Sequence, residues 1–281
     1  MGTHTYDATG DALRRQQNGI ASLVGLDGVV PVNIQFTRSA HESDNLKTLR
    51  VLDRDAITVT ARRGPRKPLV SDVFDALWLE ALRIRAKYFG FTNADIILSP
   101  DLLDWIRADA REAYIVSRQE TGVSPPPSGT MTIYGADVFV VQASWWTAHR
   151  RRFRGYILGE AIWDNVYASV LMCHANAAIE NRRPLVRHEA HPQQWTISGP
   201  FAEYQRLLAA YDATYFSLWC TYIARLIEMR ERGSSAEEEE EMARRTFRWP
   251  PPVRTRLTQA ARNVKASFLY AFARGRPPAP K

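Results

Sequence analysis

The spacing of apolar positions along the chain alternates between a helical and an extended period. Apolar residues recur at helical spacing in four segments, 9–27, 70–87, 101–109 and 163–179. A long apolar and aromatic stretch over 200–230 predicts one or two further helices. Shorter apolar or alternating runs predict strands at 29–36, 56–60, 88–92, 113–117, 136–141 and 184–186. This alternation of helices and strands predicts an α/β fold whose sheet is parallel in part.

Segments rich in glycine, proline or charge separate these elements. The basic stretch 62–68 and the Gly/Pro/Ser-rich stretch 121–130 predict loops, because their prolines and glycines interrupt regular structure. Residues 38–50 are polar and charged, and they predict a loop or a weak helix. Ser71 is a candidate N-cap for the second predicted helix. The acidic run 237–241 predicts either a solvated helix start or a linker.

The bulk composition is that of a globular protein in a reducing compartment. The chain has 281 residues, of which 45% are hydrophobic, and this is enough for a sizeable core. Its two cysteines, Cys173 and Cys220, lie far apart and form neither a disulfide framework nor a zinc-binding spacing. The sequence has neither a run of about 20 apolar residues nor the apolar core of a signal peptide. We therefore expect a cytoplasmic protein that is attached, if at all, to the inner face of the cell membrane.

The net charge of +7 is concentrated at one end of the chain. Residues 244–281 contain ten Lys and Arg and no Asp or Glu, so the preceding residues carry a charge of −3. A uniformly basic nucleic-acid-binding domain has a different charge distribution, and we expect no nucleic-acid partner. Aromatic and aliphatic residues among the arginines indicate an amphipathic basic helix over 256–273. Such a helix would suit an anionic membrane surface, and the alternative is a solvated or packed C-terminal helix.

Two polar side chains, Asn93 and Asp95, follow the predicted strand at 88–92. A carboxylate at the end of a buried strand costs several kcal/mol unless another group pairs with it. Ligands of open α/β sheets bind at the carboxyl ends of the strands, so this position favours a cation and ligand site. The alternative is a turn, because Asn and Asp also bond their own backbone.

Three further clusters hold residue types that serve in catalysis or ligand binding. Arg118 is a cation directly after a predicted strand. Glu160 and Asp164 are two acids about one helical turn apart at a helix start, where the alternative is ordinary N-terminal capping. His188 and His191 are a candidate metal-ligand pair, and the alternative is two structural histidines. The sequence has no HExxH motif and no cysteine ligand set, which argues against a zinc protease.

The order of several motifs resembles one family, although neither GxGxxG nor a P-loop is present. The motifs lie at 16–23, 72–75, 88–97, 117–118, 135–139, 159–165 and 188–191. Over about residues 12–210 the chain resembles the nucleotide-sugar-dependent glycosyltransferases of the GT-A type and their bacterial glycosyltransferase-like relatives. This resemblance implies a GT-A-like α/β fold, with a mixed, mostly parallel sheet flanked by helices and a helical C-terminal extension.

The resemblance also implies a donor site. Asn93 and Asp95 fall where GT-A enzymes carry a DxD-type motif, which binds a divalent cation (Mn²⁺ or Mg²⁺) that clamps the nucleotide-sugar diphosphate. His188 and His191 fall near the C-terminal ligand of that metal, so the implied metal ligands are Asp95 and this pair. Arg118 is suited to contact phosphate, because a guanidinium binds phosphate oxygens in a fork. Asn93, Asp95 and Arg118 are thus the expected nucleotide-sugar contacts.

The implied reaction moves a sugar from a nucleotide-sugar donor to a glycan or lipid-linked acceptor. Asp164, or Glu160, falls where such enzymes keep an acid near the acceptor. In an inverting reaction this carboxylate would be the general base. Because Asn93 replaces the first acid of DxD, the alternative is a catalytically inactive GT-A-like scaffold that binds glycan, nucleotide or a partner protein. A third alternative is a basic membrane-docking module.

The resemblance divides the chain into three parts. Residues 1–200 form the GT-A-like domain, 201–243 a helical extension packed on it, and 244–281 a basic C-terminal tail. Many GT-A enzymes begin with a strand that forms part of the nucleotide pocket. Here only residues 1–10 precede the first predicted helix, so we expect that strand to be missing or degenerate.

Overall fold

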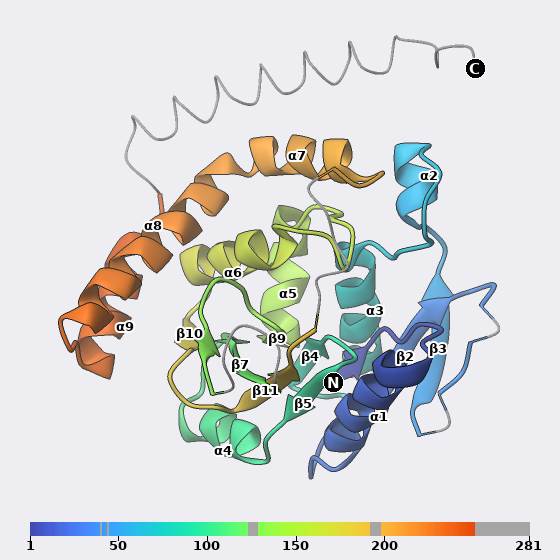
Figure 1. The fold of residues 1–281 in the computed structure, drawn as a ribbon, viewed down its shortest axis with the longest axis horizontal. Coiled ribbons are helices and arrows are strands. Elements are labelled where there is room, and N and C mark those ends of the chain that lie inside the picture. The colour runs from blue at the N-terminus through green and yellow to red at the C-terminus, as the bar shows by residue number, and fades with distance from the viewer. Residues whose placement is uncertain (40, 44, 123–128, 192–197, 251–281) are drawn as a thin grey trace.

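The structure, a computed structural model, is drawn as a ribbon in Figure 1. It describes residues 1–39, 41–43, 45–122, 129–191 and 198–250.

A seven-stranded sheet forms the centre of the fold, in the order β10-β6-β9-β4-β1-β2-β3. Six of its strands run parallel, and β9 is antiparallel to both β4 and β6. The strands are β1 (Gly2–Thr3), β2 (Val32–Phe36), β3 (Lys47–Leu52), β4 (Tyr88–Thr92), β6 (Ala113–Val116), β9 (Val138–Gln142) and β10 (Ala177–Glu180). This mixed, mostly parallel sheet flanked by helices confirms the predicted fold class.

Helices cover both faces of the sheet and enclose two hydrophobic clusters. The larger cluster includes Phe74, Trp146, Tyr167 and Leu226, which belong to the helices α3 (Val70–Arg83), α5 (Ala143–His149), α6 (Trp163–His174) and α8 (Ala213–Glu231). The smaller cluster lies under α1 (Gly10–Val24) and α4 (Asp101–Ala108). The central strands are therefore buried on both faces, whereas the edge strand β3 is largely exposed. Most of their side chains are apolar, but β2 also buries the polar side chains of Asn33 and Gln35.

A second, four-stranded sheet extends from the ends of the central strands, in the order β5-β11-β7-β8. Along the chain, β5 (Ile96–Leu98) follows β4 and β7 (Arg118–Thr121) follows β6. The other two strands are β11 (Val186–Glu189) and β8 (Met131–Thr132). Because β11 pairs with both β5 and β7, it brings the histidine segment next to the ends of β4 and β6.

Four local predictions are wrong. The helix predicted over 163–179 ends at His174, and Ala177–Glu180 form the strand β10 instead. Residues 56–60 form the helix α2 (Ala56–Thr60) instead of a strand, because the Asp55 carboxylate accepts a hydrogen bond from the Thr58 backbone nitrogen at 2.8 Å and caps the helix. The polar stretch 38–50 contains most of β3, which pairs in parallel with β2. Ser71 lies inside α3, and Leu69 occupies its N-cap.

The first strand was expected to be missing or degenerate, and it is present with only two residues. Gly2 and Thr3 form β1 in the middle of the central sheet, where Gly2 pairs with Val32 of β2 and with Phe91 of β4. The following residues run along the same end of the sheet as the loop after β4. There the Thr5 backbone nitrogen donates to Asn33 Oδ1 at 3.1 Å.

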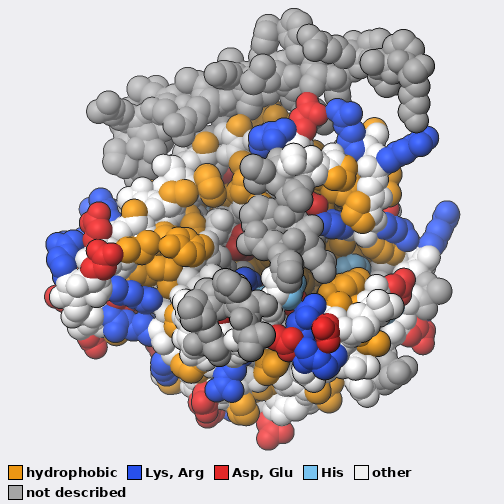
Figure 2. Space-filling model, in the orientation of Figure 1, with side chains coloured by type: hydrophobic (Ala, Val, Ile, Leu, Met, Phe, Trp, Pro, Cys, Tyr) orange, Lys and Arg blue, Asp and Glu red, His pale blue; other side chains and the backbone are white. Residues whose placement is uncertain are grey.

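Helix α8 packs on α6, and α7 (Ala202–Tyr211) and α9 (Ala236–Thr246) pack on α8. In α8, Trp219, Tyr222 and Leu226 are buried. The acidic run is the start of α9, where Ser235 and Glu238 form a capping box. The charged side chains of α9 gather at the left of the surface in Figure 2.

Several predictions concern residues that the structure leaves undescribed. The predicted helix at 256–273 lies outside the described residues, as does most of the loop at 121–130. The domain boundaries at 200 and 243 stay predictions. Among the described helices, none has both the length and the apolar character needed to cross a membrane.

Candidate functional site

Strands β4 and β6 end beside the start of β9, and this places two polar side chains together. In the strand register, Val138 of β9 lies between Thr92 of β4 and Val116 of β6. The adjoining residues, Asn93 and Asp137, therefore face each other just beyond the sheet. The Asn93 side-chain amide donates to Asp137 Oδ1 at 3.3 Å. This register therefore explains why polar groups gather at the carboxyl ends of β4 and β6, as predicted.

The turn after β4 carries Asp95, and α1 fixes its position. Gly19 of α1 packs directly on this turn, because a Cβ on Gly19 would lie 2.3 Å from the Ala94 carbonyl oxygen. That distance is too short for any side chain, so the close approach requires glycine. The helix therefore holds the turn, and with it the Asp95 carboxylate, at the end of the sheet.

Asp95, His188 and His191 form one cluster. His191 Nε2 lies 3.2 Å from Asp95 Oδ2, and His188 Nε2 lies 3.6 Å from the same oxygen. One potential ligand atom from each residue lies within 4.8 Å of the other two, which is close enough to hold a metal ion. The three residues come from segments that are more than 90 positions apart in the sequence, and β11 brings them together.

The electrostatics of this cluster favour an ionised aspartate. Burial would raise the pKa of Asp95, but hydrogen bonds from His188 and His191 outweigh it and hold that pKa well below its usual range. For His188, burial lowers the pKa, but the carboxylates of Asp95 and Glu120 more than compensate and raise it to about 9. Without a cation, the cluster is an ion pair between Asp95 and a protonated His188.

Glu120 bonds His188 through the ring nitrogen opposite the one that faces Asp95. Its Oε2 lies 2.8 Å from His188 Nδ1, and it is 2% exposed. Burial would raise the pKa of Glu120, but His188 and Arg118 lower it to about 2, so Glu120 is an acceptor and His188 Nδ1 must be the donor. This bond directs His188 Nε2 toward Asp95.

Arg118 joins Glu120 to Asp137. Its Nε donates to Glu120 Oε1 at 2.5 Å, and its Nη1 donates to Asp137 Oδ1 at 2.9 Å. Burial lowers the pKa of Arg118, but these two carboxylates outweigh it and raise that pKa above its usual value. The guanidinium is therefore committed to two buried acids, and its direct contact with a phosphate stays a prediction.

The donor set fits a metal ion. A metal-bound histidine ordinarily gives its other ring nitrogen to a carboxylate, and Glu120 supplies that carboxylate for His188. Asp95 offers an ionised oxygen on the opposite side of the ring. The ligands are one carboxylate and two imidazoles, a combination that suits Mn²⁺ and other transition-metal ions better than the oxygen-seeking Mg²⁺.

Asp164 lies on the other side of Asp137, in the first turn of α6. Its Oδ2 accepts from the Ala136 backbone nitrogen at 3.3 Å. A Cβ on Gly135 would lie 2.4 Å from the same oxygen, so a larger residue at position 135 would require this carboxylate to move. Burial, and then the negative charge of Asp137, raise the pKa of Asp164 to about 6. Asp164 can therefore accept a proton near neutral pH.

Glu160 has a different environment from Asp164. Its Oε1 accepts from Lys67 Nζ at 2.7 Å, and Glu160 is 8% exposed. Lys67 also donates to the Gly159 carbonyl oxygen at 3.2 Å. The structure thus separates the two predicted acids: Glu160 is paired with a lysine from the basic loop, whereas Asp164 faces another acid.

Sequence reasoning assigned no role to Glu120, Asp137 or Lys67. Asp137 fell inside the strand predicted at 136–141, whereas in the structure it directly precedes β9, which begins at Val138. Glu120 lies two residues after Arg118, on the same side of a short strand. Lys67 lies in a basic loop whose partner, Glu160, is 93 positions away, so no local pattern connects them.

Comparisons with known proteins identify the fold. No protein-family model matches the chain, and no curated protein matches it. Among solved structures, residues 1–349 of S. aureus TarS are similar to it, with a TM-score of 0.50 and 11% identity, over 99% of this chain and 91% of that one. The same fragment in complex with UDP-GlcNAc gives a TM-score of 0.50 and 10% identity, over 99% and 92% of the two chains.

The class of fold follows from this similarity. TarS is a GT-A-type glycosyltransferase, and the chain described here has a GT-A-type fold, as the sequence predicted. At 11% identity the likeness concerns the fold alone, so the roles of the clustered residues rest on their own geometry.

The raised pKa of Asp164 predicts a pH-dependent stability. An acid whose pKa is raised by folding stabilises the native state fully below its ordinary pKa near 4, and this contribution is lost as the pH rises through about 6. Asp164→Asn, which is neutral throughout, should therefore gain roughly 1–2 kcal/mol over the parent between about pH 4.5 and about pH 7.5. Urea unfolding at both pH values measures this difference.

A matched variant controls for the general effect of removing an acid. Asp104 is exposed on α4, and Asp104→Asn should change stability equally at both pH values. If the difference between Asp164→Asn and the parent does not change with pH, Asp164 has an ordinary pKa.

Proposed function

We propose that the chain is a glycosyltransferase that takes a sugar from a nucleotide-sugar donor with the help of a divalent cation. The observation that carries this proposal is the cluster of Asp95, His188 and His191 at the carboxyl ends of the strands, with Glu120 behind His188. A bound cation would neutralise the charge that develops on the departing diphosphate. The GT-A-type fold supports the same site, and the TarS complex makes UDP-GlcNAc the first donor to test.

Each residue has a defined part in this proposal. Asp95, His188 and His191 hold the cation, and Glu120 fixes the ring of His188. Arg118 binds Glu120 and Asp137 and holds both carboxylates in place, so it positions His188 through Glu120. Mn²⁺ is the preferred ion, because two imidazoles are poor ligands for Mg²⁺.

Asp164 is the proposed general base on the acceptor hydroxyl, if the reaction inverts the anomeric centre. A base works best when its pKa is near the operating pH, and Asp164 has a pKa of about 6. We assign Glu160 to positioning, because its carboxylate is already paired with Lys67. The acceptor proposed from the sequence resemblance is a glycan or a lipid-linked glycan, as in polysaccharide biosynthesis.

Asn93 supports the alternative of an inactive scaffold. A neutral amide stands where the first acid of the DxD-type motif is expected, and this amide is hydrogen-bonded to Asp137. A scaffold of this kind would bind nucleotide and cation without turnover. Binding and transfer therefore need separate measurements.

Donor binding should raise the melting temperature, because a ligand that binds only the native state stabilises it. With Mn²⁺ and UDP at about 100 times its Kd, we expect a rise of roughly 4–10 °C in a thermal-shift assay. Asp95→Ala should lose the part of this temperature rise that depends on Mn²⁺. Asp104→Ala removes an exposed acid on α4 and should retain the whole rise. The absence of any shift with UDP, GDP, CDP and TDP would exclude both the enzyme and the nucleotide-binding scaffold.

Glu120→Gln tests whether the hydrogen bond from His188 to Glu120 contributes to metal binding. The variant removes the charge that orients His188, and loss of such a partner costs about 10–100-fold in metal affinity. Titration calorimetry with Mn²⁺ measures this change. Gln119→Ala, at the next position of β7, should bind Mn²⁺ as the parent does. Equal affinity in the two variants would show that His188 is not a metal ligand.

Asp164→Asn separates donor binding from transfer. The variant should show the same nucleotide and Mn²⁺ shift as the parent, while sugar transfer falls about 10²–10⁴-fold, because the general base is gone. UDP release from UDP-GlcNAc in the presence of acceptor glycans measures the rate. Normal turnover by Asp164→Asn, with loss of turnover in Glu160→Gln, would move the role of base to Glu160.

We also propose that the tail at 244–281 binds an anionic membrane surface, which would bring a cytoplasmic enzyme to a lipid-linked acceptor. A truncation that tests it must preserve Phe247, which is 1% exposed, and Trp249, which stacks on Tyr215. The full chain should therefore sediment with anionic vesicles, and a chain that ends at Pro250 should not. Equal sedimentation of the two chains would contradict the proposal.

A further inference from the structure

Tyr134 is an exposed aromatic residue beside the proposed base. It belongs to the turn between β8 and β9 and is 66% exposed, the highest value among the large hydrophobic residues of the described ranges. Isolated exposed apolar residues are common on protein surfaces. Tyr134 differs from them in its position, because the next residue, Gly135, packs directly against the Asp164 carboxylate.

Three side chains hold the backbone of this turn. The Tyr134 carbonyl oxygen accepts hydrogen bonds from Asn165 Nδ2 at 2.6 Å and from Trp219 Nε1 at 3.1 Å. The Gly135 carbonyl oxygen accepts one from Ser117 Oγ at 3.0 Å. These donors come from α6, from α8 and from the residue that follows β6, so three separate parts of the fold fix the turn.

The turn buries its other apolar side chains but leaves the tyrosine outside. Ile133 and Ala136, on either side of Tyr134 and Gly135, are 8% and 2% exposed and belong to the larger hydrophobic cluster. The aromatic ring is thus open to solvent on a backbone that is held on both sides. Such a ring loses little conformational entropy when it binds a ligand, because tyrosine has only two side-chain torsions.

The proposed base lies close to this ring. Asp164 Oδ2 is in contact with Gly135, which is the chain neighbour of Tyr134. Because consecutive Cα atoms are about 3.8 Å apart, the Tyr134 backbone lies only one residue further from that oxygen. Asp164 also keeps part of its surface exposed. A ligand that covers the tyrosine ring can therefore present a hydroxyl group to the carboxylate.

A pyranose is the kind of ligand that suits this arrangement. One face of a pyranose ring presents C–H groups, whereas the hydroxyl groups project from its rim. An aromatic ring covers such an apolar face through dispersion and burial, and the rim hydroxyl groups stay free to meet polar partners. An acyclic polyol has no rigid apolar face of this kind.

We infer that Tyr134 binds the acceptor: its ring stacks on the apolar face of a pyranose and so places one hydroxyl group of that sugar at Asp164. The inference rests on the proposed function, because it takes Asp164 as the base. It narrows the proposed acceptor to a glycan whose accepting unit is a pyranose.

Binding of simple pyranosides tests the inference without any transfer. The full chain is titrated by NMR, with and without Mn²⁺ and UDP, using the methyl β-pyranosides of glucose, galactose and N-acetylglucosamine. At least one should bind, whereas sorbitol, the acyclic counterpart of glucose, should not. Tyr134→Ala should weaken that binding about 3–10-fold, and Tyr134→Phe should keep it within about twofold, because the ring remains. Absence of pyranoside binding by the parent, or equal binding by Tyr134→Ala, would overturn the inference.

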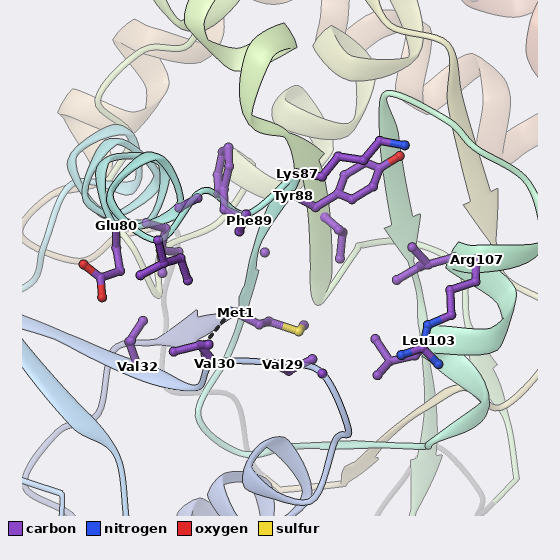
Figure 3. Close-up of a pocket in the computed structure, with 18 of the residues that line it drawn as sticks. Met1, Val29, Val30, Val32, Glu80, Lys87, Tyr88, Phe89, Leu103 and Arg107 are labelled. Atoms are coloured by element: carbon purple, nitrogen blue, oxygen red, sulfur yellow. Dashed lines mark hydrogen bonds between the residues drawn. The ribbon is translucent and has the colours of Figure 1, made fainter.

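Two control variants show where the pyranoside binds. A cavity of about 540 Å³ with a mostly apolar lining lies at the start of β4, away from the candidate site, and could also hold a small ligand (Figure 3). Ala81→Met would fill part of this cavity. Leu79→Ala removes another exposed apolar side chain, on α3. Both variants should bind the pyranoside as the parent does, and weaker binding by Ala81→Met would place the sugar in the cavity and overturn the inference.

Kinetics separate contact with the acceptor from mere support of the turn. With UDP-GlcNAc and a pyranoside that binds, Tyr134→Ala should raise the acceptor KM about 3–10-fold and leave the donor KM unchanged. Its melting temperature should stay within about 2 °C of the parent, because the ring is exposed. A larger fall in melting temperature, or an equal rise in both KM values, would contradict the inference. Pyranoside binding through Tyr134 without any shift by Mn²⁺ and nucleotide would instead contradict the proposed function.

Discussion

The guanidinium of Arg118 is the interaction on which the candidate site depends. It stands where the central sheet passes into the small one and bonds Glu120 on one side and Asp137 on the other. Two buried acids at this point would repel each other without a cation between them. Arg118 helps to lower the pKa of Glu120, which orients His188. It also bonds Asp137, whose negative charge adds to burial in raising the pKa of Asp164. One side chain thus connects the metal cluster to the surroundings of the proposed base.

The sequence predicted those parts of the fold and site that depend on local patterns. The strand before Asn93 and the helix start at Asp164 both have a period that can be read within one segment. The acids Glu120 and Asp137 were missed because their partners are 68 and 19 residues away, respectively, across loops. The wrong prediction at 56–60 has a physical cause. Ile57, Thr58 and Val59 are β-branched and favour a strand, but Asp55 caps the segment and stabilises a helix instead.

The shortness of β1 explains why the sequence indicated a missing or degenerate first strand. Two residues give no period, so no pattern could reveal a strand in the centre of the sheet. Yet Gly2 pairs with both β2 and β4, and its neighbours lead to Asn33 at the end of the sheet that carries the site and to Val30 at the opposite end.

The two ends of β4 differ in what holds them. Tyr88 at its start lines a cavity, whereas Asn93, five residues further along, is bonded to Asp137 at the site. The contact of Gly19 with Ala94 holds the turn that carries Asp95. Across from this turn, Glu120 bonds His188, and Arg118 bonds Glu120. The candidate site is therefore fixed by contacts that do not involve the residues at the start of β4.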